Sequence, residues 1–544
     1  MQGRSRQDRE LLDAGELAGH LVPAGSVFAF LAGHRRELFP DSFTADLFTS
    51  GTGRPSLPAD LVGSVLVLQA LYDLSDGQAA DALRFDIRWK VACGRSLAQV
   101  SFDPSTLVYW RKRIAESSWP DRVFGAVAEV IAQAGVLRGK RRRVIDSTVL
   151  GDAVATQDTV TQLTAAIRKV ARVVPGAGEV IAAVCTLDYG KPGKPPIDWD
   201  DPQAKEQLVS DLVNDALAVL AGLAGEDAPE REDAAAGALG LLALVAGQDV
   251  EPAEDSDGTD GRWRIARKVA PDRVISTVDT QARHTRKGKS ARRDGFRAHV
   301  AAEPETGLIT GCELTMAAGE GSGDAENGVQ LAAADRSGGG AGAGETGSGQ
   351  DEPAGARQDQ PEGLQVYGDS QYGSGQARAD YQAAGHDTVI KPIPLRPAVP
   401  GGFTLDDFAI SQDDGTVTCP AGHVRPMSAK RYVSFGPVCA ACPLRARCTT
   451  AKDGRCLDIH PHEHLLRAAR AQARTPEFKQ AYRTRAVIER IIAWTATSSG
   501  HRIRLRYLGV AKNNAWLHGR SAAINLRTLV NAGLTRRDGA WLIA

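Results

Sequence analysis

Residues 475–494, TPEFKQAYRTRAVIERIIAW, have the features of a single helix with one apolar side. Thr475 is a residue type that caps helix N-termini, and Pro476 suits the first helical position, where a missing N–H costs nothing. The apolar side is formed by Ala481, Val487, Ile488, Ile491, Ile492 and Trp494. The pattern predicts a helix with one buried side and one side available for polar contacts.

Three polar residues share one face of this predicted helix. Tyr482, Arg485 and Glu489 are spaced by three and then four residues, which aligns them along the helix. A glutamate held beside an arginine in this way can be directed into a site built by other segments. For this helix alone, the simpler interpretation is an Arg–Glu pair on a solvated face.

Two aspartates elsewhere in the chain favour the first interpretation. Asp146 lies among strand-forming residues in RRRVIDSTVL (141–150), and Asp369 ends a short apolar strand in LQVYGDSQYGSG (364–375). Two strand-borne aspartates and a helix-borne glutamate supply the hard oxygen ligands of a two-metal site. Other carboxylates compete with them, and composition does not rank the candidates: Asp152, Asp279, Asp294 and Asp324.

The motifs around these carboxylates resemble those of bacterial insertion-sequence DDE transposases, in the branch with a Tyr-Arg-Glu signature. The resemblance rests on IDSTVLGD, YGDSQYGSGQAR and the Tyr482–Arg485–Glu489 spacing, and extends to RFDIRWKVACG, DGFRAHVA and LRYLGVAKNNAWLHGRSAAINLRTL. It implies an RNase H-like core in which Asp146, Asp369 and Glu489 bind Mg²⁺ or Mn²⁺. Tyr482 and Arg485 would contact DNA or position Glu489.

One position departs from the signature, which usually continues to a lysine seven residues after the glutamate. Position 496 is alanine, so Lys512, Arg502 or Arg504 would have to make the corresponding phosphate contact. The residues predicted to bind DNA are Tyr482, Arg485, Arg490, Arg111, Arg113 and Lys512.

A cysteine-rich block separates the second aspartate from the glutamate and resembles a zinc ribbon. The predicted structural Zn²⁺ ligands are Cys419, Cys439, Cys442 and Cys448, with His423 or Cys456 as substitutes. The alternative is a set of reduced cysteines that bind no metal. The HPHEH run (460–464) fits an exposed strand or turn better than a metal cluster.

The charge is unevenly distributed along the 544 residues. The formal net charge is −1, but residues 465–544 hold fifteen Lys/Arg against three Asp/Glu. A basic block of this kind suits a polyanionic partner such as DNA. A coding bias toward arginine explains the preference for Arg over Lys but not the asymmetry of sign.

The N-terminal region predicts a helical domain. We expect an amphipathic helix at 58–72, a turn at 73–75 and a helix capped by Ser75. Arg/Lys/Trp-rich segments follow at 84–90 and 101–114. Helices joined by short turns and carrying basic residues suit DNA docking. A small bundle without a DNA role fits nearly as well.

The predicted fold is an α/β catalytic core, an RNase H-like mixed sheet flanked by helices, with an all-α N-terminal domain and inserted helical and zinc-ribbon-like segments. The predicted segments are 1–130, the N-terminal domain; 140–317, the first part of the core, with a helical insertion at 152–270; 318–362, flexible and acidic; 363–400, the strand with the second Asp; 401–460, zinc-ribbon-like; and 465–544, the Glu helix and basic C-terminal helices.

Finer features of the core are also predicted. Strands are expected at 273–280 and 388–393, a hairpin around the turn 305–307, and a basic loop at 283–293. Within the acidic segment, at most one ragged helix is expected, around 325–335.

These features together predict a transposase that binds the terminal repeats of its element, cuts the 3′ ends and joins them to target DNA. Its predicted partner is double-stranded DNA, on which a dimer or higher multimer assembles. The rivals are an RNase H-like nuclease without strand transfer and an inactive DNA-binding relic. The N-terminus has no apolar signal core, so we expect a cytoplasmic, bacterial, nucleoid-associated protein with no membrane partner. The sequence contains no Walker GxxxxGK[ST] motif, no GxSxG elbow and no dinucleotide-binding fingerprint, which is a Gly-rich turn between a strand and a helix.

Overall fold

The computed structural model describes residues 1–5, 11–224, 233–268, 270, 272–287, 291–335 and 363–544. Most of the predicted acidic segment, residues 336–362, lies outside this set. In the described part of this segment, α12 (Asp324–Ala334) forms where at most one ragged helix was expected, around 325–335.

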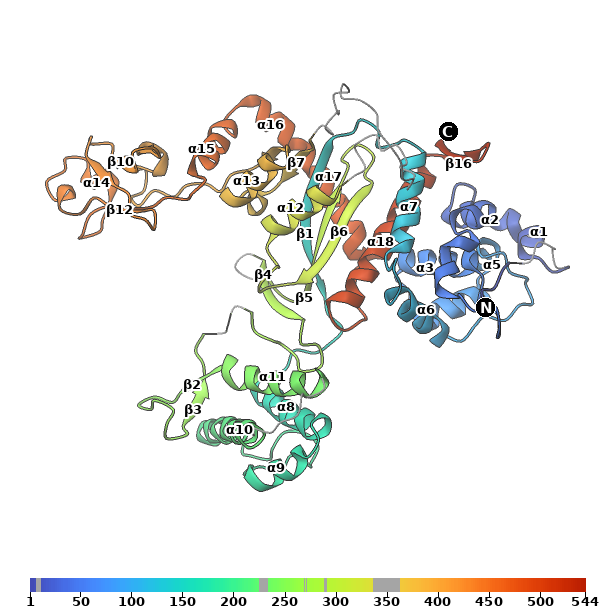
Figure 1. The fold of residues 1–544 in the computed structure, drawn as a ribbon, viewed down its shortest axis with the longest axis horizontal. Coiled ribbons are helices and arrows are strands. Elements are labelled where there is room, and N and C mark those ends of the chain that lie inside the picture. The colour runs from blue at the N-terminus through green and yellow to red at the C-terminus, as the bar shows by residue number, and fades with distance from the viewer. Residues whose placement is uncertain (6–10, 225–232, 269, 271, 288–290, 336–362) are drawn as a thin grey trace, which may run out of the picture.

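A six-stranded mixed sheet occupies the centre of the molecule (Figure 1). The long strand β5 pairs antiparallel with β1 on one side and with β4 and β6 on the other, and β1, β7 and β8 run parallel. The strands are β1 (Arg142–Gly151), β4 (Arg283–Lys287), β5 (Ala291–Ala302), β6 (Ile309–Met316), β7 (Gln365–Gly368) and β8 (Asp387–Ile390). Parallel β1 and β7 therefore place the segments carrying Asp146 and Asp369 side by side.

Helices cover both faces of the sheet, because neighbouring residues of β1 face opposite cores. Val144 packs in a cluster with α17 (Val487–Ala496) and α18 (Val510–Asn531). Ile145 packs in another cluster with α12 and α13 (Gly375–Ala383). The mixed α/β core predicted from the sequence is present.

The N-terminal region is helical, as predicted. Its helices are α1 (Ala14–Ala18), α2 (Val27–Leu38), α3 (Ala59–Tyr72), α4 (Asp76–Phe85), α5 (Ile87–Ala92), α6 (Ser105–Ala115) and α7 (Arg122–Gln133). Ser75 caps α4 in a capping box with Gln78, as its sequence indicated. The prediction that α3 is amphipathic is wrong: polar residues such as Ser64 and Gln69 are buried too, because α3 packs between α2 and α18.

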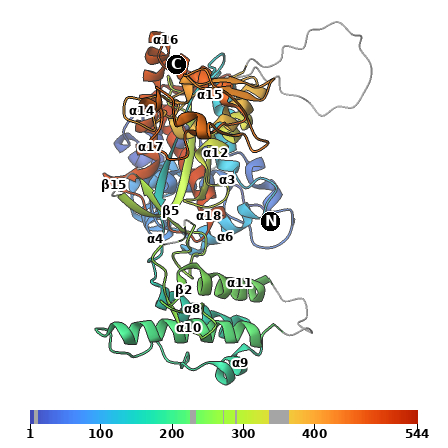
Figure 2. The same cartoon turned by 90° about the vertical axis from the view of Figure 1, so that its left-hand side faces the viewer.

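The insertion after β1 forms a separate helical body with its own core, below the sheet in Figures 1 and 2. It contains α8 (Thr159–Val173), α9 (Ala177–Val184), α10 (Pro202–Gly222), α11 (Asp233–Gln248) and the hairpin of β2 (Val250–Pro252) and β3 (Trp263–Ile265).

Two predictions at the return from this insertion are wrong. Residues 273–280 form one isolated bridge instead of a strand, because side chains take up their backbone groups: Val274 O accepts from Gln162 Nε2, and Thr277 N donates to Gln157 Oε1. Within the expected basic loop at 283–293, residues 283–287 form β4 and residues 291–293 begin β5, and residues 288–290 lie outside the described set. The β5–β6 hairpin is confirmed.

The cysteine-rich segment projects at the opposite end of the molecule from the N-terminal helices (Figure 1). It is built from β9 (Ala409–Ser411), β10 (Thr416–Thr418), β11 (Val424–Pro426), β12 (Tyr432–Ser434), β13 (Cys456–Asp458) and α14 (Arg445–Cys448). The chain then returns through α15 (Glu463–Gln472) and ends, after α18, in a hairpin of β16 (Leu534–Arg537) and β17 (Ala540–Ile543). Among the described residues, no helix is both long and apolar enough to cross a membrane.

Candidate active site

Asp146 and Asp369 are positioned by adjacent parallel strands. Asp146 lies within β1, and its Oδ1 accepts a hydrogen bond from Ser147 N at 2.8 Å. Asp369 directly follows β7, where its Oδ1 accepts from Gln371 N at 2.8 Å and caps a short 3-10 helix. Each aspartate keeps its second oxygen for other contacts, so the pair offers two carboxylate oxygens from the neighbouring inner strands β1 and β7.

The segment carrying Glu489 departs from the predicted single helix. It consists of α16 (Pro476–Tyr482), a 3-10 turn at Arg483–Ala486 and then α17. The predicted cap is confirmed, since Thr475 Oγ1 accepts from Phe478 N at 3.2 Å. Glycine and proline are absent from 477–494, so the break has no local helix breaker. The tighter turn contains Arg485, the residue that reaches β1, and 3-10 stretches inside helices often mark such functional positions.

Arg485 joins the three carboxylates. Its Nη2 lies 2.8 Å from Asp146 Oδ2 and 3.9 Å from Asp369 Oδ2. Its Nη1 lies 3.9 Å from Glu489 Oε1. The three predicted acidic residues thus converge on one guanidinium, although 343 positions separate the first from the last. The Arg–Glu pair foreseen as a simple surface contact is part of this larger group.

The four side chains of this group differ in their exposure to solvent. The side chains of Arg485 and Asp146 are each 18% exposed, that of Asp369 is 37% exposed and that of Glu489 is 74% exposed. The Arg485–Asp146 pair is therefore the least exposed part of the group, and the exposed side chain of Glu489 has room to change its rotamer.

Tyr482 stands beside these carboxylates and stacks on Phe478, with ring centroids 5.6 Å apart. Burial raises the pKa of Tyr482, and the nearby negative charges of Asp369 and Asp146 raise it further. The phenol therefore remains protonated at neutral pH and can donate a hydrogen bond to an acceptor such as a phosphate oxygen.

A groove of about 550 Å³ extends from Tyr482 along α16. Lys391, Arg474 and Lys479 line it, together with Arg470, the carboxylate of Asp406 and the apolar segment 392–395. Asp406 pairs with Arg470 at 2.6 Å and with Arg474 at 3.5 Å. Lys391, Arg474 and Lys479 could not be singled out from the sequence, because isolated lysines and arginines form no recognisable motif. They extend the positive charge of Arg485 away from the carboxylates, as a path for a polyanion requires.

The other predicted DNA-binding residues lie outside this group. Arg111 pairs with Asp76 between α6 and α4, and Arg113 donates to Tyr109 Oη at 2.6 Å and lies 4.6 Å from the centre of the Phe48 ring. Arg490 covers the Trp494 ring, while Lys512 is exposed at the start of α18. Arg113 is thus occupied by contacts within its own domain, and Arg111 is held by Asp76 and by the Tyr507 ring of the C-terminal segment, 5.3 Å away.

The donor set of the three carboxylates fits a divalent metal. Asp146, Asp369 and Glu489 offer only hard oxygen ligands. The cation at their convergence is the Arg485 guanidinium, and in this arrangement no group of three His, Cys, Asp or Glu side chains among the described residues is placed to hold an ion. Metal binding would require Glu489 to turn inward and Arg485 to give up part of its contact with Asp146.

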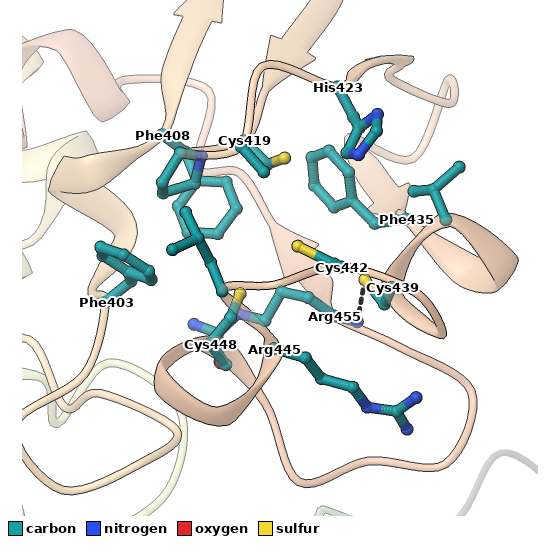
Figure 3. Close-up of a pocket in the computed structure, with 14 residues that line it drawn as sticks. Phe403, Phe408, Cys419, His423, Phe435, Cys439, Cys442, Arg445, Cys448 and Arg455 are labelled. Atoms are coloured by element: carbon teal, nitrogen blue, oxygen red, sulfur yellow. Dashed lines mark hydrogen bonds between the residues drawn. The ribbon is translucent and has the colours of Figure 1, made fainter.

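The cysteines gather at a second place. Cys419, Cys439, Cys442 and Cys448 line one small cavity together with His423 (Figure 3). Its volume is about 20 Å³, close to the room that one water molecule needs, so it excludes an organic ligand. Burial raises the pKa of Cys448, and the other three thiols nearby raise it further. Cys456 is exposed beside Ser434 and does not line the cavity.

Comparisons with known proteins identify the class. Residues 418–530 match the family described as Transposase DDE domain, and residues 26–113 match the family described as Transposase domain (DUF772). Two segments of the chain are therefore similar to transposase domains, which supports a DNA-processing enzyme.

The two matches together support the particular resemblance that the motifs indicated, to the insertion-sequence DDE transposases. The first match contains Glu489 and the cysteine block, whereas Asp146 and Asp369 lie outside both matches. No curated protein and no solved structure matches the chain.

Proposed function

We propose that this transposase binds the terminal repeats of its element, cleaves the 3′ ends and transfers them to target DNA at one site formed by Asp146, Asp369 and Glu489. The observation that carries the proposal is the position of Arg485, within 3.9 Å of an oxygen of each carboxylate. The order of the sheet, with antiparallel β5 and β6 beside parallel β1, β7 and β8, supports an RNase H-like core.

The three carboxylates would hold two Mg²⁺ or Mn²⁺ ions, which activate the attacking oxygen and stabilise the leaving oxygen in phosphoryl transfer. Asp146 and Asp369 supply ligands fixed by their strands, and Glu489 turns in from α17. Arg485 and Tyr482 hold the scissile phosphate, the first by charge and the second as a neutral donor. The basic groove beside Tyr482 guides the strand toward the carboxylates.

The rival functions make different predictions about the products. A nuclease would release cut ends without joining them, and a relic would bind the ends without cutting. The convergence of all three carboxylates favours an active enzyme over the relic. The partner is double-stranded DNA, and the need to bring two ends together favours a dimer or higher multimer on DNA.

The test is a strand-transfer assay with labelled element ends, a target plasmid and Mg²⁺ or Mn²⁺. Wild type should both cut and join, and Asp369→Ala and Glu489→Ala should bind the ends but do neither. Glu477→Ala is the matched control, an exposed glutamate on α16 outside the group. Cutting without joining by wild type would establish the nuclease, and binding alone the relic.

We also propose that the four cysteines of the small cavity hold a structural Zn²⁺. The support is their shared position around a space of ionic size. Because no three of the described cysteines yet stand at ligand distance, binding would draw the thiols together. Metal analysis should find one zinc per chain, lost in Cys442→Ser and retained in Cys456→Ser. Equal zinc content in both variants would refute this site.

A further inference from the structure

A second cavity lies at the other end of β1, about 450 Å³ in volume and open to solvent. Three arginines line it, Arg293 from β5 and Arg502 and Arg504 from the segment after α17. Asp152 and Asp294 line it as well. Segments from distant parts of the sequence therefore build one cavity rich in charge.

Among the described residues, none of the three arginines forms an ion pair with a carboxylate, although the positive charge of Arg504 lies near enough to act on Asp152. Arg502 donates to Val149 O at 2.9 Å, and Arg504 donates through Nε to Asp152 O at 3.3 Å. Both contacts are to backbone carbonyls, which leave further N–H groups of each guanidinium available. Burial lowers the pKa of Arg502, and the positive charge of the neighbouring Arg293 lowers it further, so these two cations stand close enough to repel each other. A phosphate in the cavity would relieve this repulsion.

The two carboxylates do not offset these charges equally. Asp294 is bound by His284 Nδ1 at 2.6 Å and by the Thr156 hydroxyl. Asp152 is 3% exposed, and its Oδ2 is buried without a hydrogen-bond partner. A buried acceptor without a donor is costly. The complementary ligand therefore brings an anion for the arginines and an N–H donor for Asp152.

A nucleotide in DNA has both groups. Its phosphate matches the arginines, and amino groups on base edges donate to carboxylates, as cytosine N4 does to Asp or Glu. We propose that this cavity binds a nucleotide of the element's end, with the phosphate on Arg293, Arg502 and Arg504 and an amino group of the base on Asp152.

The position of the cavity defines which nucleotide is bound. Asp152 is the first residue after β1 and follows Asp146 by six residues, or about 20 Å at the rise of a strand. Even-numbered residues of β1 share one face, and Val144 and Leu150 pack in the same cluster. A duplex that runs along β1 rises about 3.4 Å per base pair, so the cavity would lie about six base pairs inside the cleaved end. In this respect the inference rests on the proposed function.

The experiment uses the full-length protein and duplexes of the element's end in which single phosphates are replaced by neutral methylphosphonates. Neutralising a phosphate about six base pairs from the cleaved end should weaken wild-type binding by about tenfold, as for a lost charged hydrogen bond. The same replacement should have no effect on Arg502→Met/Arg504→Met, and its usual effect on the exposed-arginine control Arg138→Met. Equal sensitivity at all positions would overturn the phosphate site.

The base contact is tested by removing single amino groups, with inosine for guanine or purine for adenine. At the same position, wild type should bind the end with the amino group more tightly than the end without it. Asp152→Leu should bind both ends equally, and an unchanged circular dichroism spectrum checks that this variant is folded. Discrimination that persists in Asp152→Leu would overturn the base contact. Binding is measured without a divalent metal, so it does not depend on cleavage. A failure to cleave would bear on the proposed function alone. A failure of the expected position-dependent binding effects would bear on the cavity alone.

Discussion

The two ends of β1 gather charge in opposite ways. Around Asp146, three carboxylates surround one guanidinium, and every charged group has a partner. Around Asp152, three arginines line one cavity with a carboxylate whose buried Oδ2 has no hydrogen-bond partner. The first group carries excess negative charge, which a divalent metal would offset. The second carries excess positive charge and is completed by a ligand. One strand thus links a centre suited to chemistry with a centre suited to recognition.

The largest expected effect separates these roles. Asp146→Asn should lower strand transfer by at least about a thousandfold, the scale for groups that act directly in the transition state, while binding of the element's end persists. Asp152→Asn should change binding, and at saturating DNA its rate should stay within a few-fold of wild type. Equal loss of rate in both variants would abolish the distinction between the two ends.

A backbone prediction concerns the packing beside the arginine cavity. Gly295 has φ +143°, and a Cβ there would lie 2.0 Å from Leu150 O. Gly295→Ala should therefore destabilise the fold by about 3 kcal/mol or more, as for other strained backbone sites. Urea denaturation measures the change. Gly33→Ala, in α2 with no atom near the added methyl, should be neutral or stabilising.

The pH dependence of stability tests the buried carboxyl. Burial and the neighbouring Asp294 raise the pKa of Asp152 from 3.8 to about 6. Because the pKa is raised in the folded state, the stabilising contribution is present below pH 4 and is lost as the pH rises to about 6. At pH 7, Asp152→Asn should be more stable than wild type by about 2–3 kcal/mol. The difference should vanish near pH 4, and a pH-independent difference would contradict the assignment.

A smaller effect concerns the balance around Arg485. Arg485→Ala leaves Asp146 and Asp369 close together without a cation, which should cost about 1 kcal/mol without metal. Mg²⁺ should then raise the melting temperature of Arg485→Ala more than that of wild type, because the ion replaces the lost charge. Arg490→Ala, one residue beyond Glu489, is the control. An identical response to Mg²⁺ in all three proteins would show that the ion does not bind at these carboxylates.

Much of the site was predictable because motifs fix it locally. Asp146 and Asp369 lie on or directly after strands, and Thr475 caps the helix that precedes Glu489, as predicted. The 3-10 turn at Arg485 was not predictable, since no breaker marks it. The contact of Arg485 with Asp146 joins residues 339 positions apart.

The arginine cavity could not be predicted from the sequence, for a different reason. Arg502 and Arg504 were weighed only as substitutes for a missing lysine, and Arg293 was placed in a loop that proved to be strand. Nothing in the spacing of these residues relates them to Asp152. Similarly, residues 273–280 alternate like a strand, but Gln157 and Gln162 of the insertion occupy their backbone groups.

The central claim is that one site built on Asp146, Asp369 and Glu489 performs both cutting and joining. The most direct measurement supplies pre-cut ends with a free 3′-hydroxyl and a target plasmid to wild type and to Glu489→Ala in Mn²⁺. The account predicts that wild type joins these ends and that Glu489→Ala binds them without joining. Joining by Glu489→Ala at the wild-type rate would contradict it.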